Sequence, residues 1–511
     1  MLSLGVILGL FASFAGFLFG YDTGYISGCK EMPAFLQVYG DLQSDGTYKL
    51  STQTDSIITS ILSAGTFFGA LFAATIGDAV GRRRGILIYL VLFAIGVALQ
   101  TAGKSLGAFA AGRVLAGLGV GGTSTLVPVY QAECAPRKLR GFCVSCYQFF
   151  ITVGLLIAAV VVNATKGRPD ASAYQIPIAV QFIWGTIIAV GMFVLPESPR
   201  WLLMRDRHEE AKASLSKVIG QSTDSRAVLD EYDEIYATLQ KERALGGGSW
   251  IDCFRNGENK ARQRILTGMI LQACTQLSGI NFIFYYGTSF FSNSGIANPF
   301  LITVITNVVN VVMTVPGMLS ADFIGRRPMV MYGAAGMAVC QFIVAAVGVA
   351  TPISDKTSQS VLVAFVCIFI AHFAATFGPF SWIVTSEIPP YNLRTKSMAL
   401  STASNWLLNF AIGYATPYMV NTGPGNAGLQ TNVFWIWGGF CLLAFVFAYF
   451  MIPETKQLSL EQIDLLYLDS TPRTSAKFRR HLIQDNVHLG TTPIAVGEKA
   501  DVAHLDNSSS V

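Results

Sequence analysis

The sequence predicts an all-α polytopic membrane protein with about twelve transmembrane helices in two six-helix halves. Of its 511 residues, 52% are hydrophobic and only 13% are charged, whereas about a quarter of the residues of a soluble domain are charged. The apolar residues are concentrated in stretches of about 20, the length of a helix that crosses the hydrocarbon core of a bilayer. Charged motifs recur in the same order in both parts of the chain, which indicates that the two halves are related.

Apolar segments account for the predicted helices, and a polar stretch separates the first six from the last six. The first set covers roughly 2–28, 56–77, 85–103, 107–131, 142–163 and 176–195. The second set covers roughly 264–291, 299–321, 329–350, 360–386, 397–420 and 432–452. We therefore expect an N-terminal half at 1–195, a connection with short amphipathic helices at 196–263, a C-terminal half at 264–452 and a largely disordered tail at 453–511.

Lysine and arginine residues cluster in every second loop between these segments. Such loops usually face the cytoplasm, so we expect a multi-pass protein of the plasma membrane with both termini and the 196–263 connection in the cytoplasm. The first segment lacks a basic leader and exceeds signal-peptide length, so we interpret it as a spanning helix. One opposite loop contains a glycosylation sequon at Asn163. The net charge of +4 is too small to indicate a nucleic-acid partner.

The recurring motifs combine acidic and basic residues at the predicted cytoplasmic ends of the helices. Cytoplasmic topology explains the arginines, but it does not explain acids at matched positions in both halves. We therefore predict ion pairs that tie helix ends together and hold one conformation of the bundle. The predicted set is Asp78, Arg82, Glu133, Arg140, Glu197 and Arg200 in the first half, and Asp322, Arg326, Glu387, Arg394 and Glu454 in the second.

Nothing in the sequence indicates catalysis or a cofactor. The run Gly117–Gly122 fits the G-x-G-x-x-G nucleotide fingerprint, but no strand precedes it, and close helix packing through small residues explains it better. Cys143 and Cys146 form a single C-x-x-C in an apolar run, which argues against a metal site. His372 is the one histidine within a predicted span, and no nucleophile with a neighbouring base accompanies it.

Two opposite charges lie inside predicted spans: Asp22 in the first and Arg113 in the fourth. A charge at membrane depth costs about 2.5–3.5 kcal/mol on insertion scales, so it requires a partner or a function. One interpretation is a structural ion pair, or an aspartate near enough to the interface to remain hydrated. We favour the other, in which the carboxylate of Asp22 takes up and releases a proton.

Uncharged amides and aromatic rings occur within the apolar helices of both halves. Single amides often form interhelical hydrogen bonds, but a set spread over both halves indicates a polar cavity. An amide donates and accepts hydrogen bonds at once, as a sugar hydroxyl does, and no charged cluster accompanies the set. The residues are Gln148, Gln276, Asn281, Tyr285, Tyr286, Asn310, Trp382, Asn405, Trp406 and Asn409.

These features together resemble the sugar porter family of the major facilitator superfamily over nearly the whole chain. The motifs are Gly81-Arg82-Arg83, Pro196-Glu197-Ser198-Pro199-Arg200, Gln276-Leu277-Ser278-Gly279-Ile280-Asn281, Gly325-Arg326-Arg327 and Pro453-Glu454-Thr455-Lys456. The runs Gly20-Tyr21-Asp22-Thr23-Gly24 and Phe284-Tyr285-Tyr286-Gly287 look like those of fungal monosaccharide transporters.

The resemblance implies specific roles for some of these residues. It implies that Asp22 is the proton-coupling acid and that Arg113 is its partner, since facilitative members have an uncharged residue in place of Asp22. The chain departs from the family at Thr275, where a glutamine is usual, and this shorter hydroxyl side chain bears on the sugar preference. The implied sugar contacts are Gln148, Gln276, Asn281, Asn310, Trp382 and Asn405.

The leading hypothesis is a monosaccharide transporter, for glucose or another hexose, that imports sugar with a proton by alternating access as a monomer. Its expected partners are the sugar, the proton and the lipid bilayer. One alternative is a facilitative hexose carrier, and another is a transporter of polyols or sugar acids. A third is a membrane sugar sensor that does not transport. Such sensors typically have much longer tails than the predicted tail at 453–511.

Overall fold

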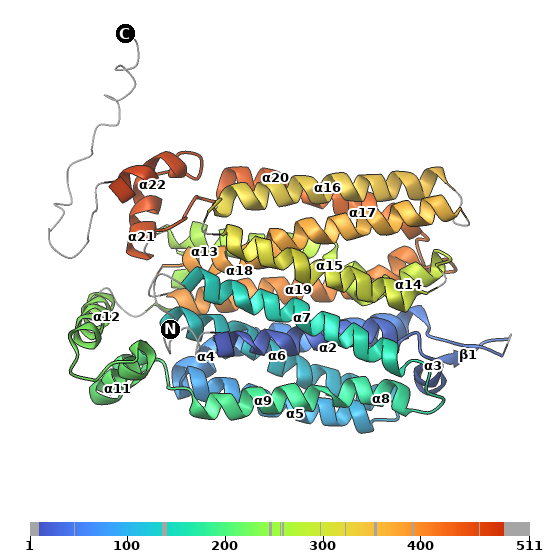
Figure 1. Ribbon diagram of the computed structural model, residues 1–511, viewed down its shortest axis with the longest axis horizontal. Helices are drawn as coiled ribbons and strands as arrows, with labels where there is room; N and C mark the ends of the chain where they lie inside the picture. Colours follow the sequence, from blue (N-terminus) through green and yellow to red (C-terminus); the bar gives the residue numbers. More distant parts are fainter. Residues whose placement is uncertain are drawn as a thin grey trace, which may run out of the picture.

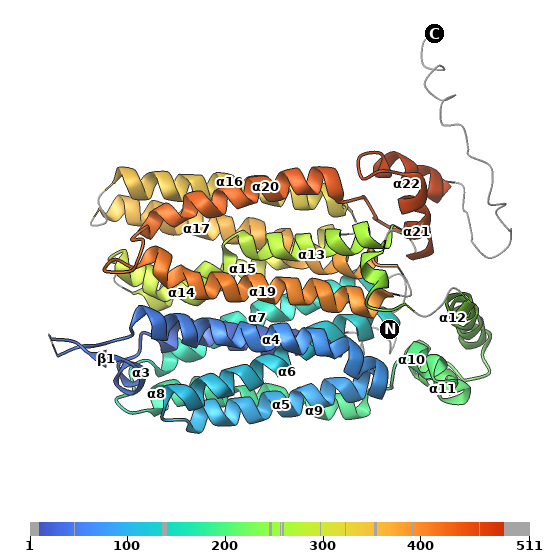
Figure 2. The ribbon, with the colours of Figure 1, turned by 180° about the vertical axis from the view of Figure 1, so that it is seen from behind.

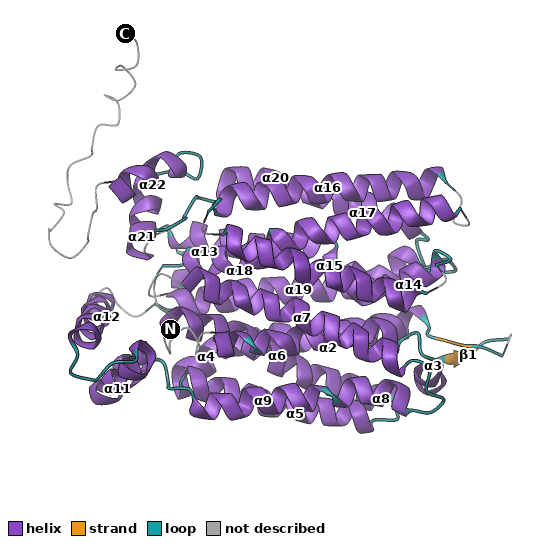
Figure 3. Cartoon of the chain, viewed as in Figure 1, coloured by secondary structure: helices purple, strands orange, loops and turns teal. Residues whose placement is uncertain are grey.

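The computed structural model is helical almost throughout (Figure 3). A short hairpin of β1 (Asp41–Leu42) and β2 (Tyr48–Lys49) is the exception among the described residues. Asp322 and the side chain of Arg140, both in the predicted ion-pair set, lie outside the described part. The structure describes residues 10–44, 46–134, 140–244, 248–255, 257, 260–296, 298–321, 323–351, 355–390, 393–458 and 460–484.

The first half of the chain forms a bundle of long helices with one short helix at its edge. The long helices are α2 (Ala15–Cys29), α4 (Thr52–Val80), α5 (Arg82–Ala102), α6 (Leu106–Cys134) and α7 (Arg140–Thr165). The last span consists of two helices, α8 (Ser172–Ala179) and α9 (Gln181–Val194), and the short helix is α3 (Pro33–Tyr39).

The second half repeats this arrangement alongside the first (Figures 1 and 2). Two of its spans are broken: α13 (Ala261–Leu277) is followed by α14 (Ile280–Asn293), and α17 (Lys356–Ala375) by α18 (Phe377–Glu387). The others are α15 (Pro299–Ser320), α16 (Arg326–Ala350), α19 (Arg394–Val420) and α20 (Val433–Met451). The predicted all-α membrane fold is therefore confirmed.

Short helices cover one end of the bundle, which also holds Arg82 and Arg326 and is called the basic end below. These helices are α10 (Pro199–Met204), α11 (His208–Ile219), α12 (Arg226–Ala244), η2 (Asp252–Phe254), α21 (Leu460–Asp469) and α22 (Ser475–Gln484). The hairpin, α3 and η4 (Gln430–Asn432) lie at the opposite end (Figure 1).

Nine described helical segments are long and apolar enough to cross a membrane. The three other predicted spans are α2, the broken pair α13–α14, and α19. α19 contains five buried polar residues, Ser401, Thr402, Asn405, Asn409 and Thr416. Their polar side chains lower the mean hydropathy of the helix. Polar side chains on a helix inside a membrane bundle face its interior. The helices that depart most from the apolar pattern are therefore candidates to line an internal site.

The glycine run in α6 packs directly against neighbouring helices. A Cβ on Gly117 would lie 2.3 Å from the carbonyl oxygen of Leu62, and one on Gly121 would lie 2.1 Å from that of Thr66. Because both distances are far shorter than any tolerated contact, only glycine lets α4 and α6 approach so closely. The packing explanation of this run is confirmed.

The two halves meet along several helix pairs. α4 packs against α19 and α7 against α15, and smaller contacts join α7 to α18, α2 to α14 and α6 to α19. α4 and α7 are the second and fifth spans of the first half. Their partners, α19 and α15, are the fifth and second spans of the second half. The interface is therefore built in the same way from both halves.

Candidate functional site

A cavity of about 40 Å³ lies between the two halves. One water requires about 10–15 Å³, so the cavity has room for only a few. Five predicted site residues meet here: Gln148, Gln276, Asn281, Trp382 and Asn405. The other lining residues are Phe19, Thr23, Ile151, Leu155, Thr275, Ile280, Phe284, Phe373, Gly378 and Ser381.

The break between α13 and α14 places two of the amides on the cavity. Gly279 has a φ of 78°, in the left-handed region that favours glycine. A Cβ at Gly279 would also lie 2.5 Å from the Trp437 ring. The turn lets Gln276, before the break, and Asn281, after it, face the same space.

The amides of the second half form one hydrogen-bonded network. The Gln276 amide donates to Asn405 Oδ1 at 2.6 Å, and the Asn405 amide donates to Gln272 Oε1 at 2.6 Å. Gln276 Oε1 accepts from Asn281 and, at 3.3 Å, from Asn409. All five side chains are buried. The network fixes which way each amide presents its donor and acceptor.

Gln272 was absent from the predicted set of amides, whereas Asn409 was part of it. Gln272 lies four residues before Gln276 on α13, as Asn409 lies four residues after Asn405 on α19. Residues four apart share one face of a helix. Searching for an amide at this spacing from Gln276 would have found Gln272.

One hydrogen bond joins the halves across the cavity. The indole Nε1 of Trp382 on α18 donates to Gln148 Oε1 on α7 at 3.2 Å. The Tyr147 ring packs edge-on against the Trp382 ring, with 5.5 Å between centroids. Gln148 is thereby oriented with its NH₂ group near Gly378, where a Cβ would lie 3.1 Å from Nε2.

The five other predicted residues do not line the cavity. Asn409 belongs to the amide network described above, and the Trp406 ring packs against Phe19 with 4.7 Å between ring centroids. Asn310 on α15 is buried, does not line the cavity, and makes no side-chain hydrogen bond within the described chain. Tyr285 donates to Asn409 Oδ1 at 2.9 Å, one step behind the cavity amides. Tyr286 donates to the carbonyl of Gly413 at 2.7 Å and lines a different pocket.

Asp22 and Arg113 are both fully buried and form an ion pair. Arg113 Nη1 lies 3.5 Å from Asp22 Oδ2 and donates to the Tyr25 hydroxyl at 2.9 Å. Tyr25 in turn donates to Gln100 Oε1 at 2.6 Å. Within the described chain neither oxygen of Asp22 accepts a hydrogen bond. A buried carboxylate with one long ionic contact is poorly compensated, which suits a group that changes protonation state.

Two paths connect this ion pair to the cavity. Tyr285 lies near both charges and donates a hydrogen bond to Asn409 in the amide network. α2, the helix that holds Asp22, also packs tightly on α7. A Cβ at Gly20 of α2 would lie only 1.9 Å from the carbonyl oxygen of Ile151 on α7. Side-chain contacts and helix packing thus join the ion pair to helices that line the cavity.

At the basic end, Arg82 is the centre of the ion pairs in the first half. Its Nη1 lies 3.0 Å from Asp78 Oδ1, and its Nε lies 3.1 Å from Glu133 Oε2. The hydrogen-bond partners of Glu197 are backbone amides: it accepts from the N–H groups of Arg83 and Ser198, both at 3.0 Å. Glu197 thus caps the start of α5.

The second half repeats this structure. Arg326 Nη2 lies 2.8 Å from Glu387 Oε1, as Arg82 pairs with Glu133. Glu454 accepts from the backbone N–H of Arg326 at 3.1 Å and of Arg327 at 3.3 Å, as Glu197 does at α5. The ion pairs of Arg82 with Asp78 and Glu133, and of Arg326 with Glu387, each join residues of the same half.

A glycine precedes each of the capped helices, α5 and α16. The capping carboxylates of Glu197 and Glu454 lie so close to these two positions that they leave no room for a side chain. Gly81 has a φ of 103° and Gly325 a φ of 110°, which L-residues rarely adopt. A Cβ would lie 2.4 Å from Glu197 Oε2 at the first and 2.5 Å from Glu454 Oε2 at the second. The recurring Gly-Arg-Arg motif thus specifies one local structure, built twice.

A hydrogen bond from the first cluster reaches the second half: Arg82 Nη2 donates to Thr395 Oγ1 at 3.3 Å. Arg394, the neighbour of Thr395, is buried at the start of α19. Arg200 is buried in α10 beside the first cluster. The clusters therefore brace each half, and the first of them contacts the second half through Arg82.

The chain matches the family model for sugar (and other) transporters over residues 8–467. It is 48% identical to the major facilitator-type transporter ecdD of Aspergillus rugulosus, covering 93% of this chain and 89% of that protein. It is 43% identical to the probable glucose transporter rco-3 of Neurospora crassa, with 90% and 79% covered. It is 42% identical to the high glucose sensor RGT2 of Saccharomyces cerevisiae, with 91% and 61% covered.

Solved structures share the fold. The proton:xylose symporter XylE bound to 6-bromo-6-deoxy-D-glucose has a TM-score of 0.77 and 29% identity, with 90% of this chain and 98% of that chain covered. The inward-open XylE of E. coli, at 27% identity and the same coverage, has a TM-score of 0.68. The arrangement of helices here is thus more similar to the sugar-bound structure than to the inward-open one.

Proposed function

Because the chain belongs to the sugar transporter family of the major facilitator superfamily, we propose that it imports a monosaccharide together with a proton by alternating access. Glucose or another hexose is the proposed sugar. The proposed orientation puts the basic end and both termini in the cytoplasm, with the protein acting as a monomer in the plasma membrane. The proposed halves are 1–195 and 264–452, joined by 196–263, and 453–511 forms the tail.

The cavity shared by the two halves is the observation on which this proposal depends. Its described lining contains amides, hydroxyls and aromatic rings, and no charged side chain. Amides suit hydroxyls because both donate and accept, and the rings of Phe19, Phe284 and Trp382 offer apolar faces to the C–H surface of a sugar. The lining therefore favours a neutral polyhydroxylated solute over an acid or a cation.

The contacts between the halves support alternating access. A solute in the cavity touches Gln148 of one half and Gln276 of the other, so each rocking position exposes it to one side. Protonation of Asp22 removes its attraction for Arg113 and loosens α2 against α6. Because α2 also packs on α7 and α14, that change reaches both walls of the cavity.

The decisive experiment is counterflow of labelled glucose in proteoliposomes, with and without an imposed proton gradient. Import driven by the gradient supports the whole proposal. Counterflow that ignores the gradient supports the facilitative alternative. Glucose binding without flux supports a sensor, the function named for the relative RGT2.

The ion-pair clusters are expected to control turnover. Neutralising one acid, Glu133→Gln, leaves the buried Arg82 with Asp78 as its remaining ion-pair partner among the described residues, which destabilises the conformation shown here. We expect glucose turnover to fall severalfold, with a change in equilibrium glucose affinity of less than twofold. Glu387→Gln is the matched variant in the second half and should behave alike. A large loss of affinity with normal turnover would contradict this role.

A further inference from the structure

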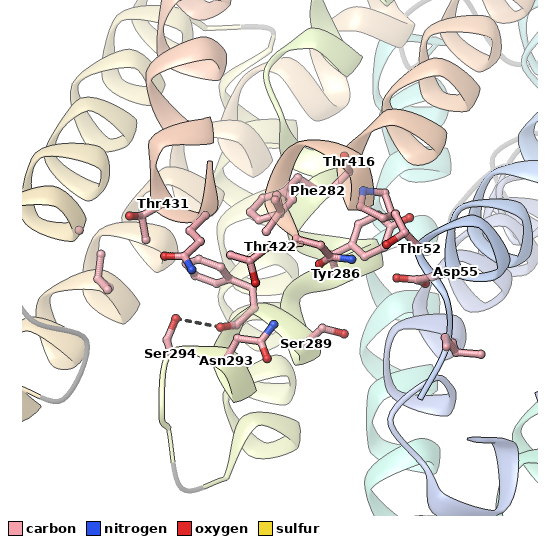
Figure 4. A pocket seen from close by; sticks show the side chains of 18 of the residues that line it. Thr52, Asp55, Phe282, Tyr286, Ser289, Asn293, Ser294, Thr416, Thr422 and Thr431 are labelled. Carbon is pink, nitrogen blue, oxygen red and sulfur yellow. Dashed lines mark hydrogen bonds between the residues drawn. The ribbon is translucent and has the colours of Figure 1, made fainter. Parts of the chain in front are cut away.

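A second and larger cavity lies at the end of the bundle opposite the basic end. Its volume is about 560 Å³, within the range of about 300–1,000 Å³ typical of small-molecule sites. Its walls come from α14, α16, α17, α19 and η4, and residues 49–55 of the first half form one side (Figure 4). It shares no lining residue with the central cavity.

The lining has the chemistry of a site for a neutral polyhydroxylated molecule. Hydroxyls and amides alternate with the rings of Phe282, Tyr286 and Phe290. The two charged residues are Lys49, which is exposed, and Asp55, whose carboxylate is held at 2.6 Å by Lys30. Within the described chain, no hydrogen bond occupies the side chains of Asn293, Asn421, Thr422 and Thr431, which leaves their donors and acceptors available.

The same wall forms the contact between α2 and α14, where the halves meet at this end. The Lys30 ammonium lies 3.9 Å from the centroid of the Tyr286 ring, and Ser289 bonds the carboxylate of Glu31. Tyr286 and Ser289 also line the cavity. A molecule in the cavity therefore touches the side chains that close α14 against α2.

We propose that this cavity is a second sugar-binding site, separate from the transport site, and that a sugar bound there holds α14 against α2 and slows opening at this end. A ligand that bridges α14 to α17 and α19 favours the conformation in which those helices lie as they do here, because it binds that conformation best. The choice of sugar as the ligand, and the placement of this end outside the cell, rest on the proposed function.

Equilibrium binding of labelled glucose to the purified full-length chain tests the site. We expect two molecules bound per chain in the wild type. Thr422→Trp places a bulky ring at an exposed position of the lining and should reduce this to one. Ser44→Trp, an exposed substitution at the same end outside the cavity, should retain two.

Combining these variants with the central site separates the two proposals. Gln276→Ala should weaken one of the two sites and leave the Thr422-sensitive site unchanged. A single wild-type site that Gln276→Ala weakens would overturn the second site and leave the proposed function standing. Retention of both sites in Thr422→Trp would also overturn it. Absence of any Gln276-sensitive site would count against the proposed function instead.

Flux measurements test the effect on α14. In wild-type proteoliposomes, glucose counterflow should rise with external glucose and then fall below its maximum as the second site fills. Thr422→Trp should show a simple saturation curve with no fall, and Ser44→Trp should match the wild type. Simple saturation in all three proteins would overturn the proposed effect on opening.

Discussion

Asp22→Asn is expected to abolish the accumulation of sugar against its gradient. Asparagine has nearly the shape of the protonated aspartate and cannot become charged, so the variant is fixed in the neutral state. Arg113 stays fully buried without its ionic partner, and the proton no longer has a binding site. Because only the coupling is lost, exchange of sugar down its gradient should survive.

The measurement is glucose uptake into energised cells or vesicles, followed to steady state. The wild type should reach an internal concentration several times the external one and lose this ratio when an ionophore collapses the proton gradient. Asp22→Asn should reach a ratio of one in both conditions. Asp41→Asn, an exposed aspartate in the hairpin, is the matched control and should behave as the wild type.

The competing role of Asp22 is purely structural. Removing one partner of a buried ion pair costs about 3–5 kcal/mol because the other charge is left uncompensated. In that case Asp22→Asn would lower the melting temperature and reduce counterflow and accumulation together. Accumulation that persists in the variant with its normal pH dependence would show that the proton binds elsewhere.

The sequence predicted the fold well because its strongest patterns are long range and redundant. Apolar segments of membrane length specify helices without help from tertiary contacts. The recurrence of Gly81-Arg82-Arg83 at Gly325-Arg326-Arg327 indicated two related halves. The structure explains that recurrence: each motif provides a glycine beside a capping carboxylate and an arginine that pairs with an acid on another helix.

Partners within the site were harder to predict. Glu197 was expected among the ion pairs, but its hydrogen bonds go to backbone N–H groups at the start of α5, a geometry that depends on how the chain turns at Gly81. Gln272 was missed because a single buried amide resembles ordinary interhelical hydrogen bonding. The cavity at the opposite end has no sequence signal, since five separate elements and residues 49–55 contribute to it.

Gln148→Ala and Gln276→Ala are expected to weaken sugar binding about tenfold to a hundredfold. Each loses an amide on a cavity that is largely closed, so a sugar hydroxyl or a protein group is left unpaired at a cost of about 1–3 kcal/mol. The two variants should differ in stability. Gln276 Oε1 accepts from both Asn281 and Asn409, so its removal disrupts the network, whereas Gln148 accepts from Trp382.

Gln148→Ala is therefore the sharper test of the binding role. Glucose affinity and detergent melting temperature should be measured together on both variants, with Gln175→Ala as the control. Gln175 bonds a backbone carbonyl on α5 and is not among the residues that line the cavity. We expect Gln148→Ala to lose affinity at a nearly normal melting temperature, and Gln276→Ala to lose both. If these amides served only to join helices, the melting temperature would fall while the affinity of the folded protein stayed unchanged, and the proposed sugar site would be wrong.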